Sequence, residues 1–460
     1  MDVPAGDSTG RKTVLFAAAT TFLLFAFMAS SVNIAIPSLG EELSLDAIML
    51  GWVATGYLLS SAALLVPSGR IADIYGRKKV FAAGIAIFTL SSFLSGMATS
   101  GVMLISFRVL QGIGVAMFAG TGVALLISVF PIAERGKVLG TIAAAVFTGM
   151  TLGPVLGGVL TQRLGWRSIF FLTVPLGLVV IAVVLLKLKG EWTGAKGEKF
   201  DFAGSLIYIV ALVALILGLT RLPGMLGVWL VVGGVVGLLM FVRWEMRIRS
   251  PILDMNLFRN SRAFTFSGVA MLLGFAPFWA VTLLISLYLQ YIKGFNPESA
   301  GLVLVAMPVM SAIFSPLAGK LSDRTEPRII ASIGMALIIV GLVMFVFLTE
   351  RTSLPSVIVN LILVGSGFAL FDAPNTNAIM SSAPKTAYGV ASATAGTMRQ
   401  FGMVLGMGIA MLMFALYIGT VPITPEYYAR FQESMRTSFI ILAVLCFGGV
   451  LVSLARGRVR

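Results

Sequence analysis

Histidine is absent from this sequence of 460 residues, and cysteine occurs only once. Without histidine, the chain cannot build an imidazole proton relay or a metal site that depends on imidazole ligands. The single cysteine, Cys446, excludes a disulfide within the chain, and its position in an apolar run indicates a small buried side chain. Charged residues are also scarce, at 11% of the sequence. We therefore expect neither a metal centre nor a cofactor.

Long apolar segments take up most of the chain, and hydrophobic residues make up 58% of it. A helix needs about 20 apolar residues to cross the ~30 Å hydrocarbon core of a bilayer. Segments of this length predict an all-α polytopic membrane protein with fourteen transmembrane helices. The first is too long for the apolar core of a signal peptide, so we expect it to be retained. We place the helices at residues 13–36, 48–68, 79–98, 101–130, 137–161, 167–187, 202–221, 226–246, 263–291, 297–318, 328–348, 355–381, 387–418 and 436–455.

The basic residues are distributed unevenly between the two sides of the membrane. The net charge of +14 would suggest nucleic-acid binding in a soluble protein. With the N-terminus placed inside, however, most lysines and arginines fall in the loops and tails of that side, which is the positive-inside pattern. The pattern predicts a plasma-membrane protein with both termini in the cytoplasm, and it accounts for the charge without a nucleic-acid partner.

A charge-dense turn, Gly69–Lys79 (GRIADIYGRKK), separates two apolar segments, and a weaker copy, Gly319–Arg328 (GKLSDRTEPR), occurs about 250 residues later. The repeat predicts two related halves. Two six-helix halves joined directly would bring the copies closer together, so we place a helical hairpin between them. The predicted organisation is a six-helix half at 1–187, an inserted two-helix hairpin with its cytoplasmic linkers at 188–262, and a second six-helix half at 263–460.

Four motifs, in order along the chain, resemble those of the major facilitator superfamily. The segment Gly69–Lys78 is similar to its signature loop, and Arg108–Gly112 (RVLQG) resembles its fourth-helix motif. Gly149–Gly158 (GMTLGPVLGG) resembles the fifth-helix motif associated with antiporters, and Trp166–Phe171 (WRSIFF) fits the start of helix six. With fourteen helices, the chain is similar to the drug:proton antiporter branch. The resemblance implies the major facilitator fold, built from two six-helix halves.

The resemblance also implies that the Gly69–Lys79 turn belongs to a conformational gate. Asp73 is expected to contact the start of the thirteenth helix, where the helix dipole favours a carboxylate, and to latch the cytoplasmic side shut. Arg70 and Arg77 would then pair with nearby acidic or carbonyl groups, with Glu134 as one candidate. The alternative is that these charges only set the topology. The gate residues in the two copies are Gly69, Arg70, Asp73, Gly76, Arg77, Lys78, Gly319, Asp323 and Arg324.

Two arginines lie inside predicted helices, where a charge costs about 2.5–3.5 kcal/mol on insertion scales. The first is Arg108, which has Gln111 one turn along on the same helix face. We expect this pair to face a central cavity and to take part in substrate or proton handling. The alternative is an arginine whose head group extends to the membrane surface.

The second arginine, Arg399, is matched by Asp372, the one carboxylate deep within a predicted helix. Their distances from the cytoplasmic helix ends are about 18 and 14 Å at ~1.5 Å per residue, so both lie near the midplane. We expect them to pair across the central cavity, with Asp372 as the protonatable site, or else to form a structural ion pair. Neutral groups that line the cavity or join helices are expected at Asn33, Gln290, Asn375, Asn377 and Gln400.

A stripe of small residues lies along one face of the fifth helix and consists of Gly149, Gly153 and Gly157. Such stripes let two helices approach closely. Pro154 and Gly158 complete the antiporter-type motif, for which the resemblance implies a tight contact that prevents leakage during antiport. In the second half, the corresponding contact is expected at Gly402 and Gly406.

These features predict a secondary transporter rather than a pump, a channel or an enzyme. No G-x-x-x-x-G-K-[ST] loop for nucleotide phosphates occurs, and the repeat of proline- and glycine-interrupted helices favours alternating access. The acidic pair Glu41–Glu42, with Asp46, indicates a solvated loop rather than a catalytic site. The antiporter branch commonly has an acidic residue where this chain has Met28, so the usual anchor for cationic drugs or protons is missing. Because two intramembrane arginines balance Asp372, a neutral or weakly anionic amphiphile is as plausible a substrate as a lipophilic cation.

We therefore predict proton-coupled export of an amphiphilic drug-like or lipid-like compound. The alternative is transport of an anionic metabolite, or facilitated movement without proton coupling. The expected partners are the lipid bilayer, the amphiphile and protons, and a single chain is expected to function as a monomer.

Overall fold

The computed structural model describes residues 8–248, 251–253, 255–322, 324–383 and 388–457. Over these ranges the chain is helical and contains no strand. The elements of the first part are α1 (Ser8–Leu43), α2 (Ala47–Tyr75), α3 (Arg77–Gly96), α4 (Gly101–Val129), α5 (Ile132–Leu164), α6 (Arg167–Lys187), α7 (Phe202–Arg221) and α8 (Met225–Glu245). Those of the second part are α9 (Met255–Asn260), α10 (Arg262–Phe275), α11 (Pro277–Leu287), the π-turn η1 (Tyr288–Ile292), α12 (Pro297–Leu304), α13 (Ala306–Ser322), α14 (Pro327–Val346), α15 (Leu354–Ser381), α16 (Tyr388–Tyr417), the 3₁₀ turn η3 (Pro425–Tyr427) and α17 (Tyr428–Ala455).

Within the described residues, fourteen helical segments are long and apolar enough to cross a membrane, which confirms the predicted number. Two of these segments are broken. The segment Arg262–Ile292 comprises α10, α11 and η1, and the segment Pro297–Ser322 comprises α12 and α13. The first break falls at Pro277, which has no backbone N–H to donate to the preceding turn. The last helix begins at Tyr428, earlier than the predicted start at residue 436. Its first two turns carry polar residues, so a prediction based on apolar segments did not include them.

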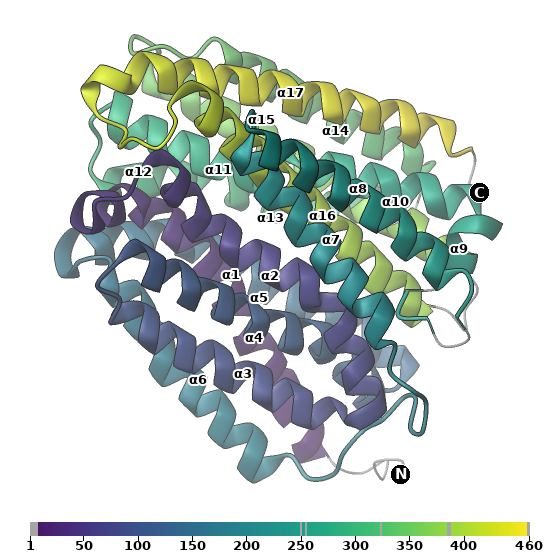
Figure 1. Ribbon diagram of the computed structural model, residues 1–460. Coiled ribbons are helices and arrows are strands. Elements are labelled where there is room, and N and C mark those ends of the chain that lie inside the picture. The colour runs from purple at the N-terminus through teal and green to yellow at the C-terminus, as the bar shows by residue number, and fades with distance from the viewer. Residues whose placement is uncertain (1–7, 249–250, 254, 323, 384–387, 458–460) are drawn as a thin grey trace.

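The helices form two bundles that lie side by side (Figure 1). The first bundle contains α1–α6, in which α1 packs on α5 and α4 packs on both α2 and α3. The second contains α10–α17, in which α14 packs on α15 and α17. Both chain termini lie at one end of the helices, and we call the opposite end, where α1 meets α2, the distal end.

The α7–α8 hairpin lies along the junction of the two bundles. Helix α7 packs against α2 of the first bundle and α16 of the second (Figure 1). Tyr208 of α7 is buried, and its hydroxyl donates a hydrogen bond to the Ala62 carbonyl on α2 at 3.0 Å. The ring of Tyr208 lies 5.6 Å from the ring of Phe401 on α16. One side chain of the hairpin thus contacts both bundles.

The glycine stripe of α5 faces α1. At Gly149, Gly153 and Gly157 alike, a Cβ atom would lie less than 3.0 Å from an atom of α1. At Gly149 that atom is the Leu23 carbonyl oxygen, and at Gly157 it belongs to Ser31. A larger residue at any of the three positions would therefore push the two helices apart. The close helix contact expected from the stripe is present, and its partner is α1.

The second bundle contains the corresponding contact. A Cβ atom on Gly402 or Gly406 of α16 would overlap a backbone carbonyl oxygen on the α10–α11 segment, that of Leu272 or Ala276. The two bundles therefore use the same glycine-dependent packing, and the contact expected at Gly402 and Gly406 is present.

The α5 motif also contacts the second bundle at the distal end. A Cβ on Gly158 would overlap the Pro297 carbonyl oxygen at the start of α12. On α12, a Cβ on Gly301 would overlap the Pro154 carbonyl oxygen of α5. Backbone therefore meets backbone across the bundle junction at the distal end. That this contact prevents leakage during antiport stays a prediction.

We expect Gly301→Ala to weaken the distal contact, because the added methyl group and the Pro154 carbonyl cannot occupy the same space. Ser38 lines a cavity at the distal end together with Pro297. The effect can be measured as the rate at which a water-soluble maleimide labels a Ser38→Cys site in a Cys446→Ala background. Labelling should become several-fold faster. Gly396→Ala is the matched control, since no atom lies within 4 Å of its Cβ position. Equal labelling rates in the two variants would contradict the prediction.

Candidate functional site

Asp372 and Arg399 form an ion pair within the membrane-spanning region. Nη2 of Arg399 on α16 lies 2.5 Å from Oδ1 of Asp372 on α15, and the Thr376 hydroxyl lies 3.3 Å from the same oxygen. The pairing predicted from the depth of the two residues is confirmed. The pair does not span the junction between the bundles, however, because α15 and α16 both belong to the second bundle. The expectation that the two side chains pair across a central cavity stays a prediction.

Both members of the pair are partly accessible, with side chains that are 34% and 33% exposed. Pro374 interrupts the α15 backbone hydrogen bonds beside Asp372. The Arg399 guanidinium also lies 5.1 Å from the centre of the Phe275 ring, and its Nε is buried without a hydrogen-bond partner. The Arg399 guanidinium therefore has unused capacity to bind a hydrogen-bond acceptor.

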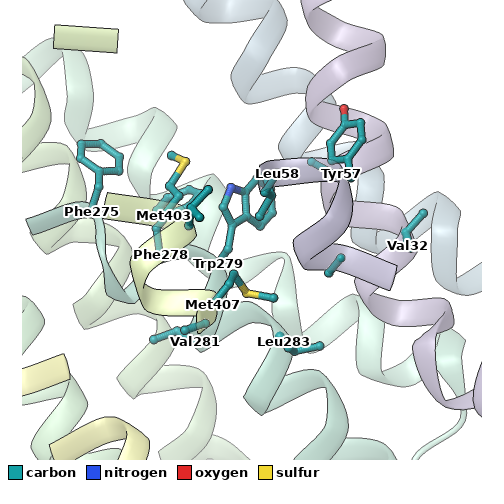
Figure 2. Packing of buried hydrophobic residues seen from close by; sticks show 14 of the residues in the cluster. Val32, Tyr57, Leu58, Phe275, Phe278, Trp279, Val281, Leu283, Met403 and Met407 are labelled. Carbon is teal, nitrogen blue, oxygen red and sulfur yellow. The ribbon is translucent and has the colours of Figure 1, made fainter. Parts of the chain in front are cut away.

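An aromatic and methionine cluster adjoins this pair. Figure 2 shows Phe275, Phe278 and Trp279, from α10 and α11, together with Met403 of α16 and Leu58 of α2. All five are buried, and the Trp279 indole N–H has no hydrogen-bond partner. Such soft, polarisable side chains adapt to ligands of different shape. Sequence reasoning missed this cluster, although a proline between aromatic residues inside an apolar segment (FAPFW) was an available signal.

Arg108 lies inside the first bundle and does not face a cavity, which corrects the sequence expectation. Its side chain is 1% exposed. Nε donates to the Val53 carbonyl at 3.0 Å, Nη1 donates to Gln111 Oε1 at 2.5 Å, and the guanidinium lies 4.1 Å from the centre of the Tyr57 ring. Gln111 is also fully buried and donates to the Ser92 hydroxyl at 2.6 Å. The group joins α2, α3 and α4, because the guanidinium finds enough acceptors there to be enclosed.

Asn33 and Gln290 lie where α1 meets the second bundle. The Ser286 hydroxyl donates to the Asn33 carbonyl at 2.8 Å, and the Gln290 amide donates to the Ile34 carbonyl at 3.0 Å. Gln290 belongs to the π-turn η1, and such turns recur at functional sites. It also borders a distal cavity of about 320 Å³, lined in part by Glu41. These groups hold the bundles together at the distal end.

The three remaining amides join helices. Asn375 is buried and donates to the Ser267 carbonyl at 2.9 Å, while Asn377 donates to the Ser322 hydroxyl at 3.0 Å. Gln400 donates to the Ser61 hydroxyl on α2 at 3.1 Å, so it links the two bundles. Of the two roles expected for these amides, lining a cavity or joining helices, all three have contacts that join helices.

The Gly69–Lys79 turn is ordered around Gly76, which connects α2 to α3. Its φ of 127° favours glycine, and a Cβ there would lie within 3 Å of the Glu191 side chain. Asp73 Oδ1 accepts a hydrogen bond from Arg77 Nε at 2.8 Å, and Arg77 also donates to the Ala124 carbonyl on α4. The turn is thus fastened to its own bundle.

The linker between α6 and α7 folds over this turn. The Asp73 carbonyl accepts the N–H groups of Gly194 and Ala195 at 3.0 and 2.9 Å. Glu191 Oε1 accepts the N–H of Lys78 at 2.7 Å, and the Lys78 ammonium bonds to the Leu188 carbonyl. In this conformation, the described partners of the turn are therefore the linker and the first bundle. The predicted contact between Asp73 and the start of the thirteenth helix adjoins residues 384–387, which lie outside the described residues.

Arg70 also binds the linker, through Glu198 at 2.5 Å, and Arg77 binds Asp73. The expectation that Arg70 and Arg77 pair with nearby acidic or carbonyl groups is confirmed. The candidate Glu134 was wrong, because Glu134 lies 3.8 Å from Arg11 at the start of α1.

The second copy of the turn is simpler. Gly319 has open space around its Cβ position, and Arg324 is exposed. Asp323 lies outside the described residues.

Comparison with known proteins identifies the family of this chain. The model of the Major Facilitator Superfamily matches residues 18–407. The chain belongs to this superfamily. Its members are transporters rather than enzymes, and the all-helical fold with fourteen candidate membrane helices agrees with a multi-pass membrane protein.

The relatives include the multidrug resistance protein Stp of Mycobacterium tuberculosis, which is 32% identical over 84% of this chain and 73% of its own length. The riboflavin transporter RibZ of Clostridioides difficile is 27% identical over 92% of each chain. Among solved structures, a bacterial homologue of the human lysosomal transporter Spinster has a TM-score of 0.72 over 98% of each chain, at 15% identity. This structural likeness shows the shared fold.

We expect Arg108→Ala to lower the free energy of unfolding by about 2–4 kcal/mol, because Gln111 and the Val53 carbonyl lose a buried partner. Thermal unfolding in detergent measures the change. Arg163→Ala is the control, since its ion pair with Glu298 is exposed and such pairs contribute about 0–1 kcal/mol. If Arg108→Ala abolishes transport and leaves stability unchanged, a role in a cavity is correct after all.

Proposed function

We propose that this transporter exports amphiphilic drug-like or lipid-like compounds across the plasma membrane in exchange for protons, by alternating access. The single observation that carries this proposal is the Asp372–Arg399 ion pair, deep in the second bundle and partly accessible. The proposed orientation places both termini in the cytoplasm, and a single chain is the proposed functional unit. The multidrug relative supports the substrate class.

Protonation of Asp372 would neutralise the carboxylate and leave the Arg399 guanidinium without its counter-charge. A fully buried charge without a partner costs about 3–5 kcal/mol, and the partial exposure of this pair reduces the cost toward about 1–2 kcal/mol. Since 1.4 kcal/mol corresponds to about tenfold in an equilibrium constant, this is enough to bias one conformation over another. Helix α1 has the buried Met28 where the antiporter branch commonly has an acidic residue, so the proposed proton site is Asp372.

The apolar cluster around Phe275 and Trp279 would bind the apolar part of the substrate. The unpartnered Trp279 N–H and Arg399 Nε are both hydrogen-bond donors, and they favour a neutral or anionic amphiphile with acceptor groups.

A second candidate is transport of an anionic metabolite, with or without proton coupling. The observation that favours it is the unused Arg399 donor, and the relative named as a riboflavin transporter carries a heterocyclic compound rather than a lipophilic cation. Thermal stabilisation of the purified protein by matched cationic, neutral and anionic amphiphiles distinguishes these substrate classes.

We expect Asp372→Asn to reduce proton-driven transport in sealed vesicles at least tenfold, because the amide cannot exchange a proton. Glu433→Gln, at an exposed position on α17, is the control and should transport normally. The measurement is substrate movement under an imposed pH gradient, together with binding of the same substrate. Undiminished coupling with normal expression would remove Asp372 from the mechanism.

We also propose that the Gly69–Lys79 turn is a gate component. In the proposed cycle, Asp73 leaves Arg77 and latches the start of α16 when the cytoplasmic side closes. The close fit of the turn to the linker at Gly76 supports a mechanical role, since charges that only set topology do not need defined partners.

We expect Asp73→Asn to reduce the transport rate about tenfold while topology and expression stay normal, because the amide lacks the charge that favours a helix N-terminus. Transport assays and cysteine accessibility of the loops measure the two properties separately. Glu134→Gln is the control, since this residue pairs with Arg11 away from the turn. Normal transport by Asp73→Asn would leave topology as the only role of these charges.

A further inference from the structure

Two acidic residues meet at the base of the inserted hairpin. Asp201 is the residue that caps the start of α7, and Glu245 is the last residue of α8. They are 6% and 2% exposed, so both carboxyl groups are withdrawn from water. Burial of an ionised carboxylate is costly unless donors or cations compensate it.

Three of the four carboxyl oxygens already accept a hydrogen bond. Asp201 Oδ1 accepts from the Gly204 N–H at 3.0 Å, and Oδ2 accepts from the Trp244 indole N–H at 3.0 Å. Glu245 Oε2 accepts from the Leu253 N–H at 2.9 Å. The fourth oxygen, Glu245 Oε1, is buried and has no donor from the protein.

That oxygen is directed at Asp201. A Cβ on Gly204 would overlap Asp201 Oδ2 and would lie 2.8 Å from Glu245 Oε1, so both oxygens converge on one point. Ionised carboxylates only accept hydrogen bonds, so a hydrogen bond between the two groups would require a proton on one of them.

We propose that Asp201 and Glu245 form a proton-binding site that holds one shared proton at the base of the hairpin. A proton suits the site better than a metal cation, because a cation such as calcium takes six to eight oxygen ligands. Here three of the four oxygens are engaged by N–H donors. The site is separate from Asp372, so it does not depend on how the transporter is coupled.

Among the described residues, no ion pair joins Asp201 or Glu245 to a basic side chain. The basic residues nearest in sequence, Lys199 in the linker and Arg243 and Arg247 at the end of α8, are exposed. The segment that packs against the site from the second bundle contributes apolar side chains, among them Leu253.

Loss of the proton would place two negative charges together in a buried position, and their repulsion would push the start of α7 away from the end of α8. Tyr208 lies two turns further along α7 and contacts both bundles. The proton therefore stabilises the position of the hairpin at the bundle junction, and this stabilisation weakens as the pH at the base of the hairpin rises.

Infrared difference spectroscopy of the purified protein tests the site directly. At neutral pH, the wild-type spectrum should contain one carboxylic-acid C=O band that is lost in Glu245→Gln. Asp201→Asn should lose the same band, because its amide can donate to an ionised Glu245. Asp372→Asn is the control and should keep the band, since its carboxylate is paired with Arg399.

The pH dependence of thermal stability provides a second readout. The folded wild-type protein holds a proton that the unfolded chain releases at neutral pH, so its Tm should fall as pH rises. In Glu245→Gln this fall should be smaller, because no proton is bound. If Glu245→Gln does not fold, Asp201→Asn provides the same comparison.

Two results would overturn the proposal. One is the absence of a carboxylic-acid band in the difference spectra, together with the same pH dependence of Tm in wild type and variant. The other is a Tm that differs between sodium and choline salts, in a protein whose spectrum lacks the carboxylic-acid band. That result would make this a cation site.

Discussion

The cost of an unpartnered polar group in hydrocarbon controls this structure. Every described membrane segment is a helix, because only a helix satisfies its own backbone groups there. The same cost governs the charges, since Arg108 is enclosed by acceptors and Asp372 is paired with Arg399. The two arrangements differ in accessibility. The enclosed arginine holds helices together, whereas the side chains of the Asp372–Arg399 pair are partly exposed.

Close backbone contact is the second constraint. Lipid tails are as apolar as the side chains, so the hydrophobic effect does not drive helices together in a membrane and close packing must do so. Glycines let α5 approach α1 in the first bundle and let α16 approach α10 and α11 in the second. At the distal end, Gly158 and Gly301 extend such contact across the junction. The bundles are therefore tightly packed units, and the contacts between them at the distal end are the ones that alternating access would have to break.

The linker connects features that are distant in the sequence. It begins at Leu188, which binds Lys78 of the charged turn, and ends at Asp201, which caps α7 and meets Glu245. From there, α7 reaches the bundle junction through Tyr208. A continuous set of contacts thus runs from the charged turn to the inserted hairpin, so a change at one end can alter the other.

The sequence by itself determined the fourteen membrane helices, since the length of each apolar segment matches the thickness of the hydrocarbon. It also predicted the Asp372–Arg399 pair from the depth of each residue. Only the tertiary structure decided that Arg108 is enclosed, that Glu134 binds Arg11, and that Asp201 meets Glu245. The reason is physical. Helix length and depth are properties of one segment, whereas the partner of a side chain depends on how each helix is rotated and which neighbour it faces, and that depends on the packing of the whole chain.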